Sequence, residues 1–309
     1  MWLTPSMPPE ASGTIQAAPG ALPLPRSSVL FRVAAEPAMV LASGPRALLL
    51  QVAHPSVAAG VAEHSDYQSR PWVRLVRTLA VVSAIAFSES THSEEASRQL
   101  RQRHATVTGR TEGGEPYRAL DPELLLWVWA TLGDSLVRVH ASFVRPLTAA
   151  ERNELYGQWK LVGYACGMPV GSCPETWADF TAYFEQMVDS RLVPTEVGQI
   201  VAGYVRRPPV PFPLNVVSGE IMHVLTGGQL PDHLRHQLGF SWTTAHHLAF
   251  EAASGASRLS ARLVPGWIRR APMTVATSSA LMSNLSRLGG VARRWAPPEG
   301  ESDGAPVHA

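Results

Sequence analysis

The chain has 309 residues, of which 45% are hydrophobic and 17% are charged, and its net charge is +1. The charged share lies below the usual value of about 25%, which favours a large buried core or an apolar ligand cavity. A net charge so close to zero gives no electrostatic reason to expect a nucleic-acid partner. The two cysteines, Cys166 and Cys173, are too few for a disulfide framework and form no Cys-x-x-Cys motif.

The beginning of the chain predicts a disordered segment followed by three helices. Residues 1–27 are rich in Pro, Ala, Gly and Ser, a composition typical of disorder. Helices are then predicted over 29–42, over 46–53 and, after His54-Pro55, over 56–63. The third of these is made of small apolar residues, so another helix or a flat ligand can approach its backbone closely.

The helix that begins at Pro71 carries two arginines near its start. Arg74, Arg77 and Thr78 share one face, because they are spaced i, i+3 and i+4. The remainder of this helix is almost wholly apolar, which predicts burial. Two arginines at the start of a buried helix need an anionic partner, and both protein carboxylates and ligand carboxylates fit that need.

The stretch 94–107 begins with acidic residues and ends with basic ones, the order that a helix dipole favours, with Ser93 as a candidate N-cap. Arg98, Arg101 and His104 follow at three-residue steps, so they lie along one face of the helix. One imidazole beside two guanidiniums fits a haem ligand next to groups that pair with propionates. It also fits a solvated basic face that includes a histidine.

The rest of the chain also predicts helices. Three glycines mark a turn or short hairpin at 108–117, and Asp121-Pro122 begins a long helix that Pro146 ends. No internal repeat and no convincing run of strands is present, so the predicted fold class is all-α, a single large helical domain of about ten to twelve helices. This domain is expected to span 28–292 and to enclose a haem or apolar-ligand pocket, with a disordered tail at 293–309. Further helices are predicted over 149–166 (with Thr148 and Glu151 as a capping box), 175–191, 195–204, 214–225, 232–237, 243–263 and 271–291.

The common catalytic motifs are absent from the sequence. It contains no Gly-x-Gly-x-x-Gly after a strand, no P-loop, no His-Glu-x-x-His and no Gly-x-Ser-x-Gly. The eleven histidines include no i, i+4 pair, which weakens the case for a non-haem metal site. Taken alone, His54, His64, His140 and His223 are each more typical of a hydrogen-bonded core histidine than of a ligand.

Four segments together resemble a known family. Residues 51–67, which read Gln-Val-Ala-His-Pro-Ser-Val-Ala-Ala-Gly-Val-Ala-Glu-His-Ser-Asp-Tyr, are similar to the early signature of the MpaB-type oxygenases. That family includes the bacterial latex-clearing proteins, which are rubber oxygenases. The segments Arg74-Leu-Val-Arg-Thr78, Arg101-Gln-Arg-His104 and Asp121-Pro-Glu-Leu-Leu-Leu-Trp-Val-Trp129 resemble signatures that follow in the family. The resemblance covers about residues 30 to 265.

The resemblance implies a protein that binds haem b and uses dioxygen on an unsaturated apolar substrate of isoprenoid type. By the same resemblance, His104 would be the proximal ligand of the haem iron. Arg101 and Arg77 would contact the propionates or support the haem from a second layer, and His64 is a further candidate for cofactor contact. An apolar pocket, an axial imidazole and cations are the groups that a haem requires.

The resemblance places Arg74 and Thr78 on the distal side of the haem, and Glu63 is the candidate for a catalytic carboxylate there. Two positions depart from the family pattern. Trp129 stands where many relatives carry histidine, and Thr108 stands where the latex-clearing pattern has a second arginine. If the family's histidine has a role, this chain lacks it.

Two alternatives stand beside the haem oxygenase. The first is a non-catalytic protein of the same fold that binds haem or an apolar ligand. The second is an all-α protein whose arginines and His104 only make internal ion pairs. The N-terminal part of the sequence has no basic region followed by an apolar run, so it predicts no signal peptide. The apolar run 79–87 is too short to cross a bilayer of about 30 Å. We therefore expect a cytoplasmic protein without an integral membrane span, acting on a cytoplasmic isoprenoid or other unsaturated lipid. Peripheral membrane association and the oligomeric state stay open.

Overall fold

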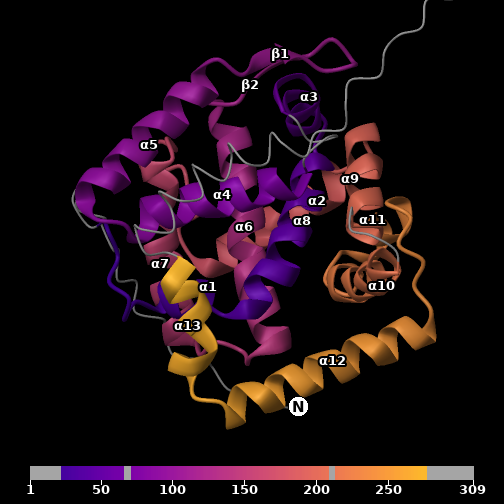
Figure 1. Ribbon diagram of the computed structural model, residues 1–309. Helices are drawn as coiled ribbons and strands as arrows, with labels where there is room; N and C mark the ends of the chain where they lie inside the picture. The colour runs from indigo at the N-terminus through magenta and orange to yellow at the C-terminus, as the bar shows by residue number, and fades with distance from the viewer. Residues whose placement is uncertain (1–21, 66–70, 209–212, 277–309) are drawn as a thin grey trace, which may run out of the picture.

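The computed structural model describes residues 22–65, 71–208 and 213–276, with the backbone alone for 71–76 and 272–276. Within those residues it contains thirteen α-helices, one π-helix and a two-stranded hairpin, and 72% of it is helical (Figure 1). The predicted all-α fold is confirmed. The first elements are α1 (Val29–Ala34), η1 (Met39–Ser43), α2 (Gly44–Val52), α3 (Pro55–His64), α4 (Pro71–Phe87), α5 (Ser90–Ala105), β1 (Thr108–Arg110) and β2 (Pro116–Arg118). The later elements are α6 (Pro122–Phe143), α7 (Ala149–Ala165), α8 (Trp177–Ser190), α9 (Glu196–Arg206), α10 (Leu214–Gly227), α11 (Asp232–Gln237), α12 (Thr244–Leu263) and α13 (Gly266–Ala276).

The long helix α6 forms the centre of the fold, and α1, α2, α7, α8, α12 and η1 pack against it (Figure 1). It begins at Pro122, as predicted, because proline is well suited to the first turn of a helix. Its apolar residues cover a broad face, and the side chain of Trp127 is fully buried. The Trp127 ring stacks on Phe184 of α8, with 5.5 Å between the ring centroids. The core is therefore built around α6.

A buried ion pair joins α2 to α6. The Nη2 atom of Arg46 lies 2.7 Å from Oδ2 of Asp134, and its Nη1 donates to the Ser135 hydroxyl at 2.7 Å. Its Nε donates to the carbonyl oxygen of Gln229, also at 2.7 Å. Arg46 is almost fully buried, and a buried charge without partners is costly, so these bonds are needed to keep the arginine inside. The Arg46 guanidinium therefore has a structural role in the core.

The predicted first helix over 29–42 is wrong. The chain instead forms α1, a turn at 35–36 and a new helical stretch from residue 37, which includes the π-helix η1 and leads directly into α2. Pro37 explains the break, because proline has no N–H to donate and its ring clashes with the preceding turn of a helix. The turn also places Glu36, whose side chain is buried, next to the far end of the chain.

The predicted cap of α5 is also wrong. The helix begins at Ser90, so Ser93 lies inside its first turn and does not cap it. The Ser93 hydroxyl donates instead to the carbonyl oxygen of Ile85 in α4, at 2.6 Å, and the side chain is buried. This bond helps to hold α4 and α5 together as a pair.

Described structure begins within the N-terminal segment predicted to be disordered, and the predicted C-terminal boundary lies outside the described residues. Leu24 lies in the segment predicted to be disordered, yet it is buried and donates its N–H to the carbonyl oxygen of Ala86 at 2.8 Å. Packed structure therefore begins before residue 28. The last described helix, α13, begins before the predicted residue 271, while 277–292 and the tail at 293–309 lie outside the described residues. No helix in the described ranges is long and apolar enough to span a bilayer, and the cytoplasmic location stays a prediction.

Candidate functional site

Helices α4 and α5 bring the predicted site segments to one end of a helix pair. The two helices pack on each other and are joined by the short connection 88–89, so the chain reverses its direction between them (Figure 1). The start of α4 and the end of α5 therefore lie at the same end of the pair. The described site residues at this end are Arg77 and Thr78 of α4 and Arg101 and His104 of α5.

The arginine face of α4 is described in part. The side chain of Arg74 lies outside the described residues. Arg77 is exposed, and Thr78 is half-buried. An exposed guanidinium is solvated by water, so the expectation that this arginine needs a buried anionic partner does not hold for Arg77.

His104 borders a cavity at the end of α5. The cavity has a volume of about 610 Å³ and opens to solvent, and ligand sites typically measure about 300–1,000 Å³. The His104 ring is half-buried, and its Nδ1 atom is buried without a hydrogen-bond partner among the described residues. Burial lowers the pKa of this imidazole, so the ring is neutral at about pH 7, which is the form that binds metals. Leaving a buried nitrogen without a hydrogen-bond partner costs free energy, so such an atom needs a structural or functional explanation.

The β1–β2 hairpin forms most of the cavity wall and adds two cations to it. In the strand register, Thr108 is opposite Arg118 and Arg110 is opposite Pro116. Residues opposite each other share a face, so Arg110 and Arg118 both lie on the exposed face of the hairpin. Arg110 also donates to the carbonyl oxygen of Gly114 at 2.7 Å. The sequence analysis predicted the hairpin but missed these arginines, which the two-residue period of the strands would have indicated.

Glu63 of α3 holds the buried face of the hairpin. The hydroxyl of Tyr117 donates to Oε2 of Glu63 at 2.7 Å. Burial, and then the nearby Glu63, raise the pKa of Tyr117 above its ordinary range, so the phenol stays protonated. Gly109 lies beneath this pair, and a Cβ atom there would overlap the Glu63 carboxylate and the Tyr117 hydroxyl. Only glycine fits at this position, and Glu63 is committed to the hairpin in this structure.

His64 makes a similar contact at the end of α3. Its Nε2 atom lies 3.2 Å from the carbonyl oxygen of Thr108, to which it donates, and 3.7 Å from Oε2 of Glu63. Thr108 is also a lining residue of the His104 cavity. The structure therefore brings the predicted site residues Glu63 and His64 to the hairpin that forms the wall of this cavity.

Arg101 points away from the cavity. Its Nη1 atom donates to the carbonyl oxygen of Ala165 at 2.7 Å, at the end of α7. Its aliphatic stem packs on Gly167, whose positive φ of 111° lets the chain turn after the helix. Arg101 is not among the residues that line the His104 cavity. The sequence placed Arg101 and His104 on one helical face, but in the structure Arg101 joins α5 to α7.

Trp129 belongs to an aromatic block in the core. Its Nε1 donates to the carbonyl oxygen of Trp159 at 2.8 Å, and Nε1 of Trp159 donates to that of Trp129 at 3.1 Å. Gly133 and Gly163 make room for this exchange, because a Cβ atom at either would lie within 2.8 Å of an indole nitrogen. Position 129 therefore offers packing and no free catalytic group. We define the aromatic block as Trp129, Tyr156, Trp159, Trp177 and Phe180.

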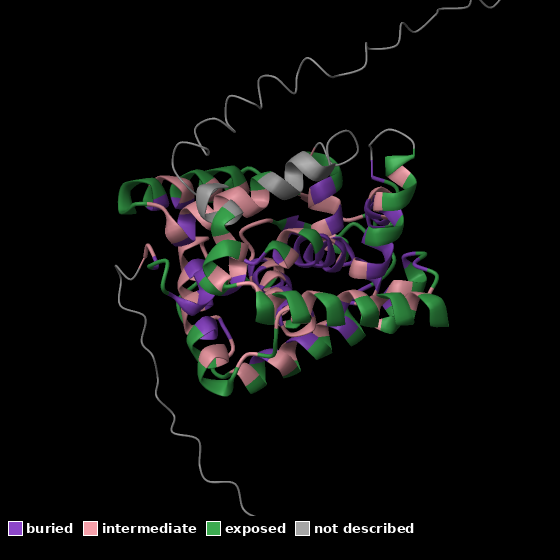
Figure 2. Cartoon of the chain, turned by 60° about the horizontal axis from the view of Figure 1, so that its bottom comes forward, coloured by how far each residue is buried: buried purple, intermediate pink, exposed green. Residues whose placement is uncertain are grey.

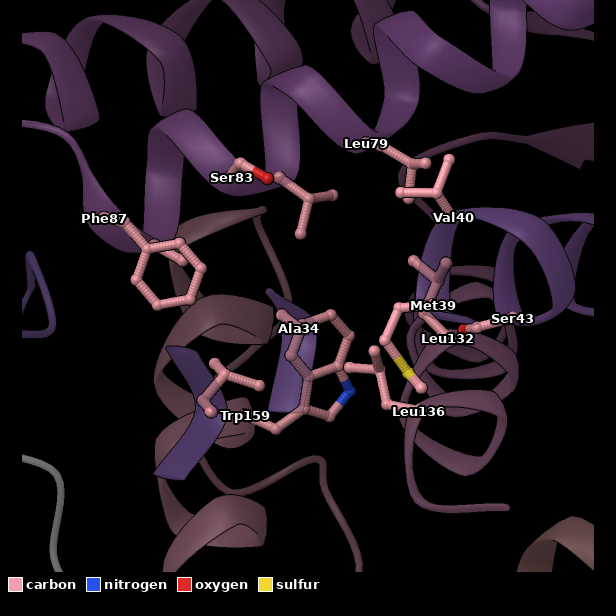
Figure 3. Close-up of a pocket in the computed structure, with 13 residues that line it drawn as sticks. Ala34, Met39, Val40, Ser43, Leu79, Ser83, Phe87, Leu132, Leu136 and Trp159 are labelled. Carbon is pink, nitrogen blue, oxygen red and sulfur yellow. The ribbon is translucent and has the colours of Figure 1, made fainter. Parts of the chain in front are cut away.

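A second, smaller cavity lies between α1, η1, α4, α6 and α7. It encloses about 70 Å³, and its walls are apolar except for two serines. Figure 3 shows the rings of Trp159 and Phe87 on this cavity, together with Leu79 and Ser83 of α4. It is smaller than the cavity of about 150 Å³ that suffices for benzene, so it holds a small apolar group at most. Leu79 follows Thr78 directly, so this cavity adjoins the segment predicted to carry the distal groups.

The sequence model described as "ER-bound oxygenase mpaB/B'/Rubber oxygenase, catalytic domain" matches residues 31–259, well over half of the chain. The chain belongs to this family. The mpaB/rubber oxygenase family predicted from the sequence is thereby confirmed, and its description is that of an oxygenase. The chain is also similar to the uncharacterized proteins Rv2237 of Mycobacterium tuberculosis and Mb2261 of Mycobacterium bovis. Each is 28% identical over 232 residues, which cover 72% of this chain and 89% of the relative. No solved structure matches the chain.

The residues around the His104 cavity fit a haem. A haem needs an axial imidazole and cations for its propionates, and the cavity offers neutral His104 with Arg110 and Arg118. The Nδ1 atom of His104 makes no hydrogen bond to any residue that the structure describes, so none of them occupies this nitrogen. Among the residues that the structure describes, no three His, Cys, Asp or Glu side chains converge on a point where they could hold a bare metal ion.

Proposed function

We propose that this member of the mpaB/rubber oxygenase family is a haem-b-dependent oxygenase. It would use dioxygen to cleave or oxygenate an unsaturated apolar substrate of isoprenoid type. The observation that carries the proposal is the state of His104: a neutral imidazole, unpartnered at a buried nitrogen, on the wall of a cofactor-sized cavity. Membership in a family of oxygenases supports the class of reaction.

The cavity wall supplies the contacts of the cofactor. His104 would hold the iron, and its lowered pKa keeps the imidazole available at a pH where a free histidine begins to take up a proton. Arg110 and Arg118 would pair with the propionates, as charge-assisted hydrogen bonds to carboxylates favour arginine. Arg77 lies at the same end of the α4–α5 pair and is the further cation proposed for this role.

Arg101 and His64 are proposed cofactor contacts that are engaged elsewhere in the structure. Arg101 would have to exchange its bond to Ala165, and His64 its bond to Thr108, before either could reach a cofactor. Both side chains are long or exposed enough to rotate without opening the core. His104 should therefore be tested before Arg101 and His64.

When bound, haem supplies the iron centre at which dioxygen is activated. The protein would position the substrate and handle protons. Thr78 and Arg74 are proposed to lie on the distal side, where their polar groups would orient dioxygen or the substrate. Glu63 is the proposed base. Its Oε2 atom accepts a hydrogen bond from the Tyr117 hydroxyl at 2.7 Å, so it can take a substrate proton there only after this bond opens.

An apolar substrate suits the second cavity. Its walls come from α4 and four other helical segments, and its volume of about 70 Å³ suits a methyl branch or a similar small group. Leu79 and Ser83 project into it from the same helix that carries Thr78 (Figure 3). A substrate with a branched hydrocarbon chain could rest one branch here while its double bond lies near the start of α4.

A non-catalytic protein that binds haem or an apolar ligand is the alternative, and two observations favour it. Trp129 is locked in the aromatic block, where many relatives are expected to carry histidine. Glu63, the proposed base, is occupied by the hairpin. A visible spectrum therefore tests the haem site, and an assay of dioxygen uptake tests catalysis.

The visible spectrum of the protein expressed with added haem precursor tests the cofactor site. We expect a stoichiometric Soret band in the wild type that is lost or strongly shifted in His104→Ala. His92→Ala is the matched control, because His92 is exposed on the same helix, near its other end. Its spectrum should be unchanged. A folded wild-type protein without a Soret band would overturn the proposal.

His54 is the strongest alternative to His104 as the iron ligand, so the same experiment includes His54→Ala. His54 also has a buried Nδ1 atom without a partner among the described residues, and burial lowers its pKa. It borders neither of the two cavities described above. If the Soret band survives His104→Ala but disappears in His54→Ala, the iron ligand is His54 and the assignment of His104 is wrong.

Dioxygen uptake separates the enzyme from the binding protein. The haem-loaded protein should consume dioxygen in the presence of squalene or a short polyprenyl compound, and should do so more slowly as Glu63→Gln. A Soret band without substrate-dependent uptake of dioxygen would favour the binding protein.

A further inference from the structure

Helix α12 turns an uncharged face toward solvent. Leu248, Leu259 and Leu263 expose 63%, 55% and 73% of their surface. At about 100° per residue these three leucines fall within about 60° of one another around the helix, so they form a single stripe. Figure 2 shows the exposed residues of α12 as a green band across the molecule. Small exposed residues lie beside and between the leucines, and the exposed charged residues Glu251 and Arg262 lie at one edge of the stripe. The small residues are Ala245, Ala249, Ala252, Gly255 and Ala256.

Two further apolar side chains extend this stripe at the corner between α12 and α13. Trp267 and Ile268 follow Leu263 closely in the chain and are 74% and 44% exposed. Trp267 and Ile268 lie at the start of α13, and large exposed apolar patches mark interaction sites. We call Leu248, Leu259, Leu263, Trp267 and Ile268 the α12 stripe.

A buried carboxylate fixes the corner that carries Trp267 and Ile268. Oε1 of Glu36 lies 2.8 Å from Nη2 of Arg269 and 2.9 Å from Nη1 of Arg270. Arg269 also donates to the carbonyl oxygen of Ala261 in α12. The two arginines therefore point inward and hold the corner, while the two apolar residues before them stay outside.

The charges of this part of the chain are segregated. Between Glu251 and Glu299 the sequence contains seven arginines, no lysine and no acidic residue, which gives +7, whereas the whole chain has a net charge of +1. Arg269 and Arg270 are engaged by Glu36, and Arg262 on α12 is exposed. An apolar stripe thus lies in a strongly basic part of the chain. The other arginines are Arg258, Arg287, Arg293 and Arg294.

We propose that the α12 stripe docks on the surface of an anionic membrane. A helix that lies in the membrane interface buries leucine and tryptophan at the boundary of the acyl chains while arginines reach the phosphates. Anionic lipids attract basic residues that lie near such a surface. The stripe supplies the apolar groups, and the basic segment supplies the charge complementarity.

Two other occupants fit less well. A second copy of this chain would bring its own arginines against these arginines, and like charges at an interface oppose association. A nucleic acid would use the arginines but would gain little from exposed leucines, because its backbone contacts are ionic. The proposed docking does not depend on haem or on catalysis, so it stands or falls independently of the proposed function.

Co-sedimentation of the full chain with lipid vesicles tests the docking. We expect the wild type to bind vesicles of phosphatidylcholine mixed with phosphatidylglycerol and to bind vesicles of phosphatidylcholine alone much more weakly. The double variant Leu263→Ser with Trp267→Ser should lower the partition coefficient about 100-fold, roughly tenfold for each apolar side chain removed. Arg262→Gln should lower binding to the anionic vesicles about fivefold and leave binding to the neutral ones unchanged.

Val170→Ser is the matched control. Val170 is 81% exposed and lies in the connection between α7 and α8, outside the α12 stripe. This variant should bind vesicles like the wild type. All replaced residues are exposed, so their thermal unfolding should match that of the wild type, which separates a loss of docking from a loss of fold.

Four outcomes would overturn the proposal. The wild type could fail to sediment with anionic vesicles at low salt. The double variant could bind as well as the wild type. The wild type could also bind vesicles through charge alone, so that double-stranded DNA competes with the vesicles and the double variant binds like the wild type. The partner would then be a nucleic acid. Self-association that the double variant abolishes, without any binding to vesicles, would assign the stripe to a second copy instead.

Discussion

Trp129 and Trp159 exchange indole hydrogen bonds inside the aromatic block, whereas His104, at the end of α5, keeps a buried nitrogen with no partner in the described structure. In the aromatic block, rings contact rings and each of these two indole N–H groups has an acceptor. At the His104 end, a hydrogen bond from Tyr117 to Glu63 joins the hairpin to α3.

The difference separates two uses of polar atoms. Within the aromatic block, Trp129 and Trp159 each donate their indole N–H to the other's backbone carbonyl, as expected of a structural core. The His104 end tolerates an unsatisfied imidazole next to a cavity, and such violations of local rules concentrate at functional sites. The contrast between the two regions supports the choice of His104 over Trp129 as the chemically active position.

Trp159→Ala should have the largest effect on stability. The change removes a buried indole together with its bond to Trp129, and large-to-small changes of this kind cost about 3–5 kcal/mol. Denaturant unfolding measures it, and Trp267→Ala, at an exposed tryptophan, should change the free energy of unfolding by less than about 0.5 kcal/mol. Equal effects of the two changes would mean that the aromatic block is not the centre of stability.

Gly109→Ala tests how tightly the His104 end is built. The added methyl would overlap the Glu63 carboxylate and the Tyr117 hydroxyl, so the hairpin must shift, at a cost of about 1–3 kcal/mol. Gly113→Ala is the matched control in the same hairpin, because its new methyl would meet only Thr111, at 3.7 Å. Urea unfolding should separate the two variants. If Gly109→Ala is as stable as Gly113→Ala, α3 does not clamp the hairpin.

Glu151→Gln should have the smallest effect at neutral pH, since it lies at the exposed start of α7. The Arg145 guanidinium, bonded to both Glu151 oxygens at 2.6 and 2.8 Å, and the Thr148 N–H hold the pKa of Glu151 at about 2, against an ordinary value of 4.5. Because folding lowers this pKa, the stability it contributes is complete above about pH 4.5 and is lost as the pH falls toward 2.

The exposed pair with Arg145 is worth less than about 1 kcal/mol at neutral pH. Thermal unfolding across the acid range measures the change: Glu151→Gln should flatten the loss of stability between pH 4.5 and about 2. An unchanged acid profile would show that the start of α7 does not rely on this ion pair.

Much of the fold could be predicted from local chemistry. The capping box of Thr148 and Glu151 begins α7 in the structure, and Pro55 and Pro122 begin α3 and α6. These signals act within one turn, so the sequence displays them directly. The break at Pro37 was missed because the apolar pattern continues past it, and the bond of Ser93 to α4 depends on a partner that capping rules do not include.

The site could be predicted less completely. Helical spacing placed Arg101 and His104 on one face, but it does not determine that Arg101 reaches the end of α7. Arg110 and Arg118 were missed because the hairpin was treated as a turn, without assigning its exposed face. Interactions between distant segments decide both cases, and one sequence carries little information on them.

The pairing of Glu36 with Arg269 and Arg270 joins positions 233 and 234 residues apart in the chain. It closes the described domain into a loop, since the segment just after the first helix holds the last one. Opening α13 would leave the buried Glu36 carboxylate without these two partners, so fraying at one end of the domain costs free energy at the other. The amides of α1 and α13 should therefore exchange with deuterium together, as parts of one cooperative unit.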